Sequence, residues 1–96
     1  MKNHIRRMAL IALTMIPAAC GITDPDFEDD GVVHFIDVEG GCWVIDAGEV
    51  RLEPINLTEE FRVDGLAVHF EAQERTDLAS ICQVGRIVEL TSIRVG

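Results

Sequence analysis

From residue 31 to residue 95, apolar and polar residues alternate in short runs, which is the pattern of β-strands rather than of helices. The clearest alternation covers residues 66–73, where every second residue is apolar. One face of this predicted strand points to the core and carries Leu66, Val68, Phe70 and Ala72. The opposite face, which includes His69, is expected to be in contact with solvent.

Further strands are predicted from runs rich in β-branched residues, and turns that contain glycine separate the first three strands of the chain. These runs cover residues 32–38, 42–46, 50–52 and 86–95. In the last strand the apolar positions change parity near Thr91 and Ser92, which predicts a β-bulge. Pro54 is expected to stop strand pairing, and residues 56–61 offer a capping asparagine and first-turn acids, which predict a short helical turn.

Three strands, a short helical connection and two further long strands follow the order of an OB-type barrel. Closing the sheet would remove edges that a small exported protein cannot safely expose. The sequence therefore predicts an all-β, five-stranded OB-like barrel over residues 31–96, and a small open β-sandwich is the alternative. A domain of this length buries little core, so we expect a covalent staple.

The first 21 residues have a different pattern, which is typical of an export signal. A positively charged start precedes an apolar run from Met8 to Ile16, and the small residues 17–19 precede Cys20. The apolar run is shorter than the roughly 20 residues that span a bilayer as a helix. We therefore expect residues 1–19 to be a signal peptide that is removed.

A cysteine directly after two alanines resembles the lipobox of bacterial lipoproteins. In that family the cysteine thiol is acylated and the chain is cut before it, so the resemblance implies a lipid anchor on Cys20. The family prefers leucine three residues earlier, where this chain has Pro17, and the alternative is an ordinary secretory peptide with an incidental cysteine. Gly21, in place of aspartate, resembles lipoproteins of the outer membrane, so we expect the cell envelope, on the periplasmic side of that membrane if the source has one.

The number of cysteines fits this interpretation, because an odd count in an exported protein leaves one thiol over. If Cys20 carries lipid, Cys42 and Cys82 remain as an even pair in a compartment where disulfides persist. The sequence therefore predicts a Cys42–Cys82 disulfide, and two buried free thiols are the alternative. Neither cysteine belongs to a C-x-x-C pair, so a redox or zinc motif has little support.

Without the signal, the chain keeps all 17 acids and only five arginines, which gives a formal charge of −12. Such a surface repels phosphate backbones, so nucleic acid is not an expected partner. It also repels anionic head groups, so attachment to the bilayer must come from acyl chains. Residues 20–30 are acidic and contain Pro25, and we expect them to form a disordered tether.

The predicted β domain also resembles a group of small bacterial lipoproteins of unknown function. The resemblance rests on four stretches, GGCWVIDA (40–47), EPINLTEEF (53–61), DGLAVHF (64–70) and SICQVG (80–85). It implies a compact β domain with a disulfide and brings no catalytic residues. This chain departs from the group at Thr58, where proline is expected, and at Leu52, where an aromatic residue is common.

Residues for catalysis are sparse, and we predict no enzymatic activity, no cofactor and no metal site. Two histidines, His34 and His69, would need a third ligand to make a metal site even if their strands paired in register. Ser80 and Ser92 could join a Ser–His–acid triad only on paper, because no nucleophile elbow is present. Trp43 is expected to pack against a disulfide, and a role as a binding aromatic is the alternative.

The sequence thus favours a membrane-anchored binding or interaction module that engages an unknown envelope protein, peptide or glycan. The alternative is a small envelope enzyme or a metal-handling protein. Three connections could bind the partner: the turn at residues 40–41, the segment 54–61 and the loop 75–79. In OB-type barrels the first and last of these flank the usual groove, so Arg75 and Asp77 are the candidate partner-binding residues.

Overall fold

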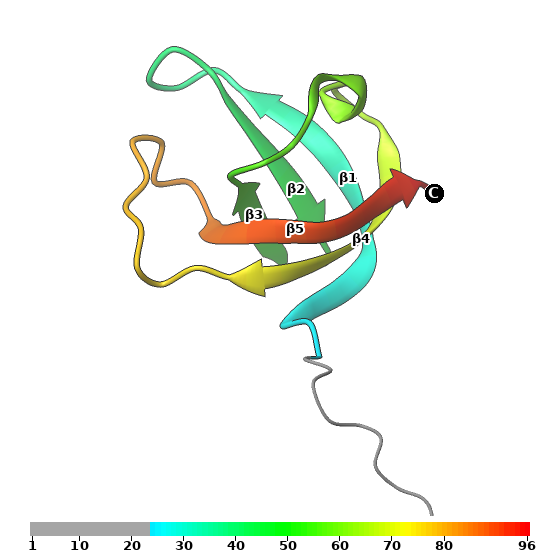
Figure 1. Cartoon of the computed structure of the whole chain (residues 1–96). Coiled ribbons are helices and arrows are strands. Elements are labelled where there is room, and N and C mark those ends of the chain that lie inside the picture. Colours follow the sequence, from blue (N-terminus) through cyan, green and yellow to red (C-terminus); the bar gives the residue numbers. More distant parts are fainter. Residues whose placement is uncertain (1–23) are drawn as a thin grey trace, which may run out of the picture.

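The structure is a computed structural model that describes residues 24–96. Five strands form one closed barrel in the order β1-β2-β3-β5-β4 (Figure 1). Their bounds are Phe27–Ile36 for β1, Cys42–Ala47 for β2, Val50–Pro54 for β3, Ala67–Glu74 for β4 and Arg86–Val95 for β5. The prediction of a small OB-like barrel is confirmed, and the open sandwich is wrong. The predicted signal peptide and Cys20 lie outside the described residues.

β1 closes the barrel because it pairs with two partners in succession. Its first half pairs with β4 and its second half with β2, and Val32 has a partner in both strands. Gly31 precedes this crossing, where a Cβ would lie 2.6 Å from Cγ2 of Ile45 and 3.0 Å from the carbonyl oxygen of Asp46. A residue without a side chain is therefore needed for β1 to bend against β2.

The interior of the barrel is filled by apolar residues from all five strands. The alternation predicted in β4 is confirmed, because Val68, Phe70 and Ala72 are fully or almost fully buried. They pack with residues from the other strands and the β3–β4 connection, namely Val33, Ile45, Ala47, Leu52, Leu57, Val88 and Leu90. The predicted bulge in β5 is also confirmed, since Thr91 is an extra residue between two consecutive pairs with β4.

The acidic segment before residue 31 is in part a strand, so the prediction of a disordered tether over residues 20–30 is wrong for its last four residues. β1 begins at Phe27, which packs against the core and pairs with Ala72 of β4. The three acids that follow Phe27 are exposed, so their charges stay in water while the backbone pairs. A short acidic segment can therefore form a β-strand when it pairs with a strand that is distant in sequence.

The helical turn after β3 is confirmed as η2, a single 3-10 turn over Glu59–Phe61, but its predicted cap is wrong. The residue at the cap position is Thr58, and its side chain makes no capping hydrogen bond. Asn56 instead binds β5, since its Nδ2 donates to the carbonyl of Leu90 at 2.9 Å and its Oδ1 accepts from the amide of Leu90 at 2.8 Å. The side-chain amide of Asn56 therefore continues the hydrogen bonding between β3 and β5 beyond Pro54, the last residue of β3.

Candidate binding site

β2 and β3 diverge at one end of the barrel, and this fork is the starting point of the candidate site. Their pairing covers Ile45–Ala47 and Val50–Leu52. Beyond these residues the two strands separate. The first residues of β2 stay paired with β1, whereas Glu53 and Pro54 of β3 pair with β5. The segment 75–85, here called the cover loop, connects β4 to β5 and supplies the other residues of the fork (Figure 1).

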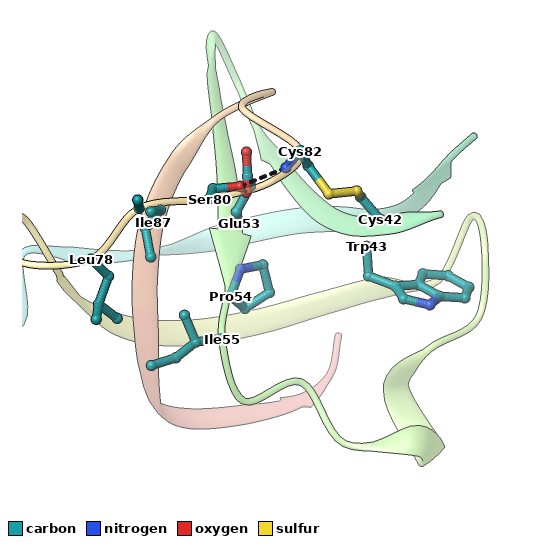
Figure 2. A pocket seen from close by; sticks show the side chains of 10 residues that line it. Cys42, Trp43, Glu53, Pro54, Ile55, Leu78, Ser80, Cys82 and Ile87 are labelled. Carbon is teal, nitrogen blue, oxygen red and sulfur yellow. Dashed lines mark hydrogen bonds between the residues drawn. A yellow bond between two sulfur atoms is a disulfide. The ribbon is translucent and has the colours of Figure 1, made fainter. Parts of the chain in front are cut away.

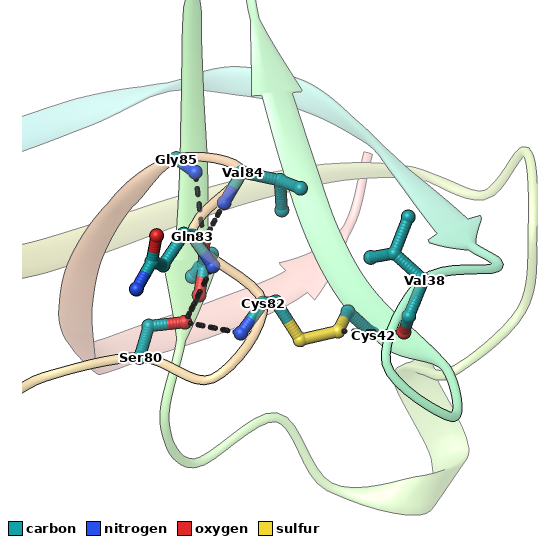
Figure 3. The surroundings of a disulfide bond; sticks show 8 residues. Val38, Cys42, Ser80, Cys82, Gln83, Val84 and Gly85 are labelled. Carbon is teal, nitrogen blue, oxygen red and sulfur yellow. Dashed lines mark hydrogen bonds between the residues drawn. A yellow bond between two sulfur atoms is a disulfide. The ribbon is translucent and has the colours of Figure 1, made fainter.

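A buried carboxylate at the fork organises the cover loop. Glu53 is only 8% exposed, and its Oε2 accepts hydrogen bonds from the amides of Val84 at 2.6 Å and Gly85 at 2.7 Å (Figure 3). Its Oε1 accepts a hydrogen bond from the Ser80 hydroxyl. A buried carboxylate is costly without such donors, and three of them compensate for the water that it has lost.

Gly85 allows the cover loop to approach β3 this closely. A Cβ at Gly85 would lie 2.5 Å from the carbonyl oxygen of Arg51, closer than two such atoms can come. Any larger residue would push the loop away from β3 and away from the carboxylate of Glu53. The S-I-C-x-x-G stretch and the E-P stretch of the sequence therefore meet in space, although Glu53 and Ser80 are 27 positions apart along the chain.

The Ser80 side chain stabilises a turn in the middle of the cover loop. Its Oγ accepts hydrogen bonds from the amides of Cys82 at 3.0 Å and Gln83 at 3.1 Å while it donates to Glu53. The serine oxygen is thus fully engaged in holding the loop. To act as a nucleophile it would first have to leave these partners, and its neighbour in space is a carboxylate rather than a histidine.

The predicted disulfide between Cys42 and Cys82 is confirmed. It joins the first residue of β2 to the cover loop, with a Cα–Cα distance of 6.4 Å and a sequence separation of 40 (Figure 3). The carbonyl oxygen of Val38 lies 3.5 Å from the sulfur of Cys42, so the 37–41 loop is adjacent to the bond. The disulfide and Glu53 together hold the cover loop at two points.

Between the two attachments lies an apolar pocket of about 260 Å³. Figure 2 shows its wall, which includes Pro54, Ile55, Leu78, Ile87 and, next to Cys42, Trp43. Ile55 is 48% exposed and Leu78 is 41% exposed, which is high for such large apolar side chains. The pocket is therefore an open apolar surface whose walls come from β2, β3, β5 and the cover loop.

Trp43 is half-buried at this end of the barrel. Its ring packs against Phe35, the residue opposite it on β1, with a centroid distance of 5.1 Å and an interplanar angle of 60°. Packing of Trp43 against the disulfide stays a prediction, although Trp43 lines the same pocket as Cys42 and Cys82. The indole thus belongs both to the packing of the barrel end and to the pocket.

The two candidate partner-binding residues of the loop lie together and bind each other. The guanidinium of Arg75 donates to both carboxylate oxygens of Asp77, at 2.9 and 2.8 Å, and also to Glu89 of β5 at 2.9 Å. These hydrogen bonds from Arg75 hold the pKa of Asp77 below its usual range. Arg75 therefore fixes the start of the cover loop to β5, and neither charge projects freely towards a partner.

The two histidines do not meet. The β1–β4 register places His69 opposite Asp30, with 2.8 Å between Nδ1 of His69 and the carboxylate, whereas His34 lies four residues further along β1. His34 is 3.2 Å from Asp64, whose pKa is lowered, first by a hydrogen bond from the amide of Phe35 and then by His34. Within residues 24–96 no three His, Cys, Asp or Glu residues are grouped so that they could hold a metal ion.

Sequence reasoning did not identify Glu53, and it included Ile55 and Leu78 only as members of the candidate connections 54–61 and 75–79. Glu53 gave no signal of its burial, since charged residues are mostly exposed and Arg51, on the other side of Leu52, is charged as well. Nothing distinguished Ile55 and Leu78 from the other residues of these connections, because isolated apolar residues in connections are common.

No family model, curated protein sequence or solved structure matches the chain. Across the part of the chain that the structure describes, none of the helical segments has the length and apolar character to cross a bilayer. The likeness to small bacterial lipoproteins and the acylation of Cys20 stay predictions.

Proposed function

We propose that this chain is a lipid-anchored binding module of the bacterial envelope that receives an apolar side chain of a partner protein in the pocket beside the cover loop. The observation that carries the proposal is the apolar pocket itself, with Ile55 and Leu78 exposed at its wall. Apolar side chains gathered at a concave surface are a common feature of interaction sites.

The attachments of the cover loop support a binding role because they preorganise the pocket. The Cys42–Cys82 bond and the hydrogen bonds to Glu53 hold the loop before any partner arrives. Binding then costs little ordering of the loop, and more of the contact energy contributes to affinity.

The size of the pocket favours a side chain over a free small molecule. Pockets for drug-sized ligands measure roughly 300–1,000 Å³ and enclose most of the ligand. The pocket here, at about 260 Å³, is smaller and open to solvent. One or two anchoring side chains on a larger partner would fill it while the rest of the partner contacts the rim.

The proposed location is consistent with the chemistry of the chain. A disulfide persists in an oxidising compartment such as the bacterial envelope, and Cys20 offers the point of acylation. Anchoring would confine the module to the membrane surface, where a partner in the same membrane or next to it is at high local concentration.

The test is capture from envelope extracts with a pocket variant and a matched control. Leu78→Asp places a charge in the pocket wall. Val63→Asp places the same charge at an apolar residue of similar exposure, 50% against 41%, that does not line the pocket. A true partner is captured by the wild type and by Val63→Asp, is lost with Leu78→Asp, and then binds the purified chain directly. Capture that survives Leu78→Asp would show that the pocket is not the site.

A further inference from the structure

The apolar pocket has an acidic rim. Asp77 adjoins the pocket residue Leu78, and Glu89 lies two residues beyond Ile87, so that it points from the same face of β5. On the other side, the exposed residues Asp37 and Glu39 flank Val38, whose carbonyl oxygen lies next to the disulfide sulfur. Four exposed carboxylates therefore lie close along the chain to residues of the apolar pocket or its disulfide, and two of them, Asp77 and Glu89, are paired with Arg75.

The arginines of the domain do not offset this charge. Arg75 is the cation of the rim, and it is shared between Asp77 and Glu89. Arg51 pairs with Asp46, and Arg86 pairs with Glu74. The described residues carry 17 acids and five arginines, so the field around the pocket is negative.

We infer that the partner segment is a basic peptide in which one large apolar residue is flanked by lysine or arginine. The inference rests on the proposed function and specifies its ligand. The apolar side chain would enter the pocket beside Leu78 and Ile55, where it loses contact with water. The flanking cations would lie over the acidic rim, where they speed the encounter and exclude acidic competitors.

The charge of the domain argues against the other occupants of such a pocket. A second copy of this chain would bring the same excess of acids to the interface, and like charges there are unfavourable. An anionic membrane surface or a nucleic acid would be repelled for the same reason. A basic polypeptide is the partner for which both the apolar floor and the acidic rim are complementary.

The test uses three synthetic peptides and the full chain in phosphatidylcholine vesicles. GKKLKKG carries the apolar anchor and the cations, GKKSKKG lacks the anchor, and GEELEEG inverts the charge. Trp43 is the single tryptophan of the chain and lines the pocket, so its fluorescence reports binding. We expect GKKLKKG to bind about tenfold more tightly than either control peptide, with an affinity that falls as NaCl rises from about 0.05 to about 0.5 M.

Paired charge variants locate the interaction. Asp37→Asn with Glu39→Gln removes two acids from the rim, whereas Glu28→Gln with Asp29→Asn removes two from the half of β1 that pairs with β4. The rim variant should bind GKKLKKG several-fold more weakly, and the β1 variant should bind like the wild type apart from a small uniform effect.

Three results would overturn the inference. They are equal binding of GKKLKKG and GKKSKKG, equal binding of GKKLKKG and GEELEEG, and no response of Trp43 to GKKLKKG at concentrations up to about 1 mM. A pocket-dependent partner captured from envelope extracts would leave the proposed function standing even then. If the wild type captures no such partner, or if capture survives Leu78→Asp, the proposed function is removed, whatever the peptides do.

Discussion

Replacing Glu53 with glutamine removes one negative charge from the attachment of the cover loop and hardly changes volume. The glutamine oxygen can still accept from the amides of Val84 and Gly85, but its NH₂ group then faces the Ser80 hydroxyl, which loses its acceptor. One charge-assisted hydrogen bond is lost and two are weakened. Since hydrogen bonds to charged groups contribute about 1.5–3 kcal/mol each, the expected loss is about 2–4 kcal/mol.

That loss is large for a domain of this size. A stability of about 0.05–0.15 kcal/mol per residue gives about 4–11 kcal/mol for residues 24–96. Urea unfolding followed by the fluorescence of Trp43 would measure the change, with Glu49→Gln, at an exposed turn, as the control. Hydrogen exchange at the amides of Val84 and Gly85 should accelerate in Glu53→Gln because their acceptor is weaker.

The outcome that would refute this reasoning is specific. If Glu53→Gln lost less than about 0.5 kcal/mol, like an ordinary surface substitution, the carboxylate would not be holding the cover loop. Unchanged exchange at Val84 and Gly85 would lead to the same conclusion, even if the global stability fell for another reason.

Four further outcomes follow from the structure. Replacing both disulfide cysteines with alanine should lower the free energy of unfolding by about 4 kcal/mol, from the entropy of a loop closed across a separation of 40, as measured by urea unfolding. Asn56→Ala should lose about 1–3 kcal/mol in the same assay, because two backbone groups of β5 lose their partner. A hydrogen bond from Arg51 lowers the pKa of Asp46 from 3.8, so this pair stabilises the fold above that pH and the effect is lost as pH falls further. Stability measured between about pH 2 and pH 6 should therefore depend less on pH in Arg51→Met than in the wild type. Cys20→Ala should give a soluble or uncleaved chain, and a variant with normal mature mass that stays with membranes would exclude the lipid anchor.

The parts of the fold that could be predicted depend on local pattern. The alternation in β4 identifies its buried face because neighbouring side chains of a strand point to opposite sides. The change of parity near Thr91 marks the bulge for the same reason. The disulfide followed from counting thiols in an exported chain, which needs no knowledge of the fold.

The parts that could not be predicted depend on contacts between residues far apart in the chain. The start of β1 looks like an acidic tether until Phe27 meets Ala72. Asn56 looks like a helix cap, since its binding to Leu90 becomes visible only when β5 lies beside β3. The candidate site shares this property, because Glu53 becomes its centre only after the cover loop has folded back.

The bond between Cys42 and Cys82 also changes what a protease can do to this protein. It closes a covalent ring that contains β2, β3, η2, β4 and most of the cover loop (Figure 3). A single cut anywhere inside the ring leaves both fragments joined, and the nicked chain is heavier only by one water. The exposed tip of the loop, where Ile81 is 79% exposed, could therefore be cleaved without release of a fragment until a reductant opens the bond.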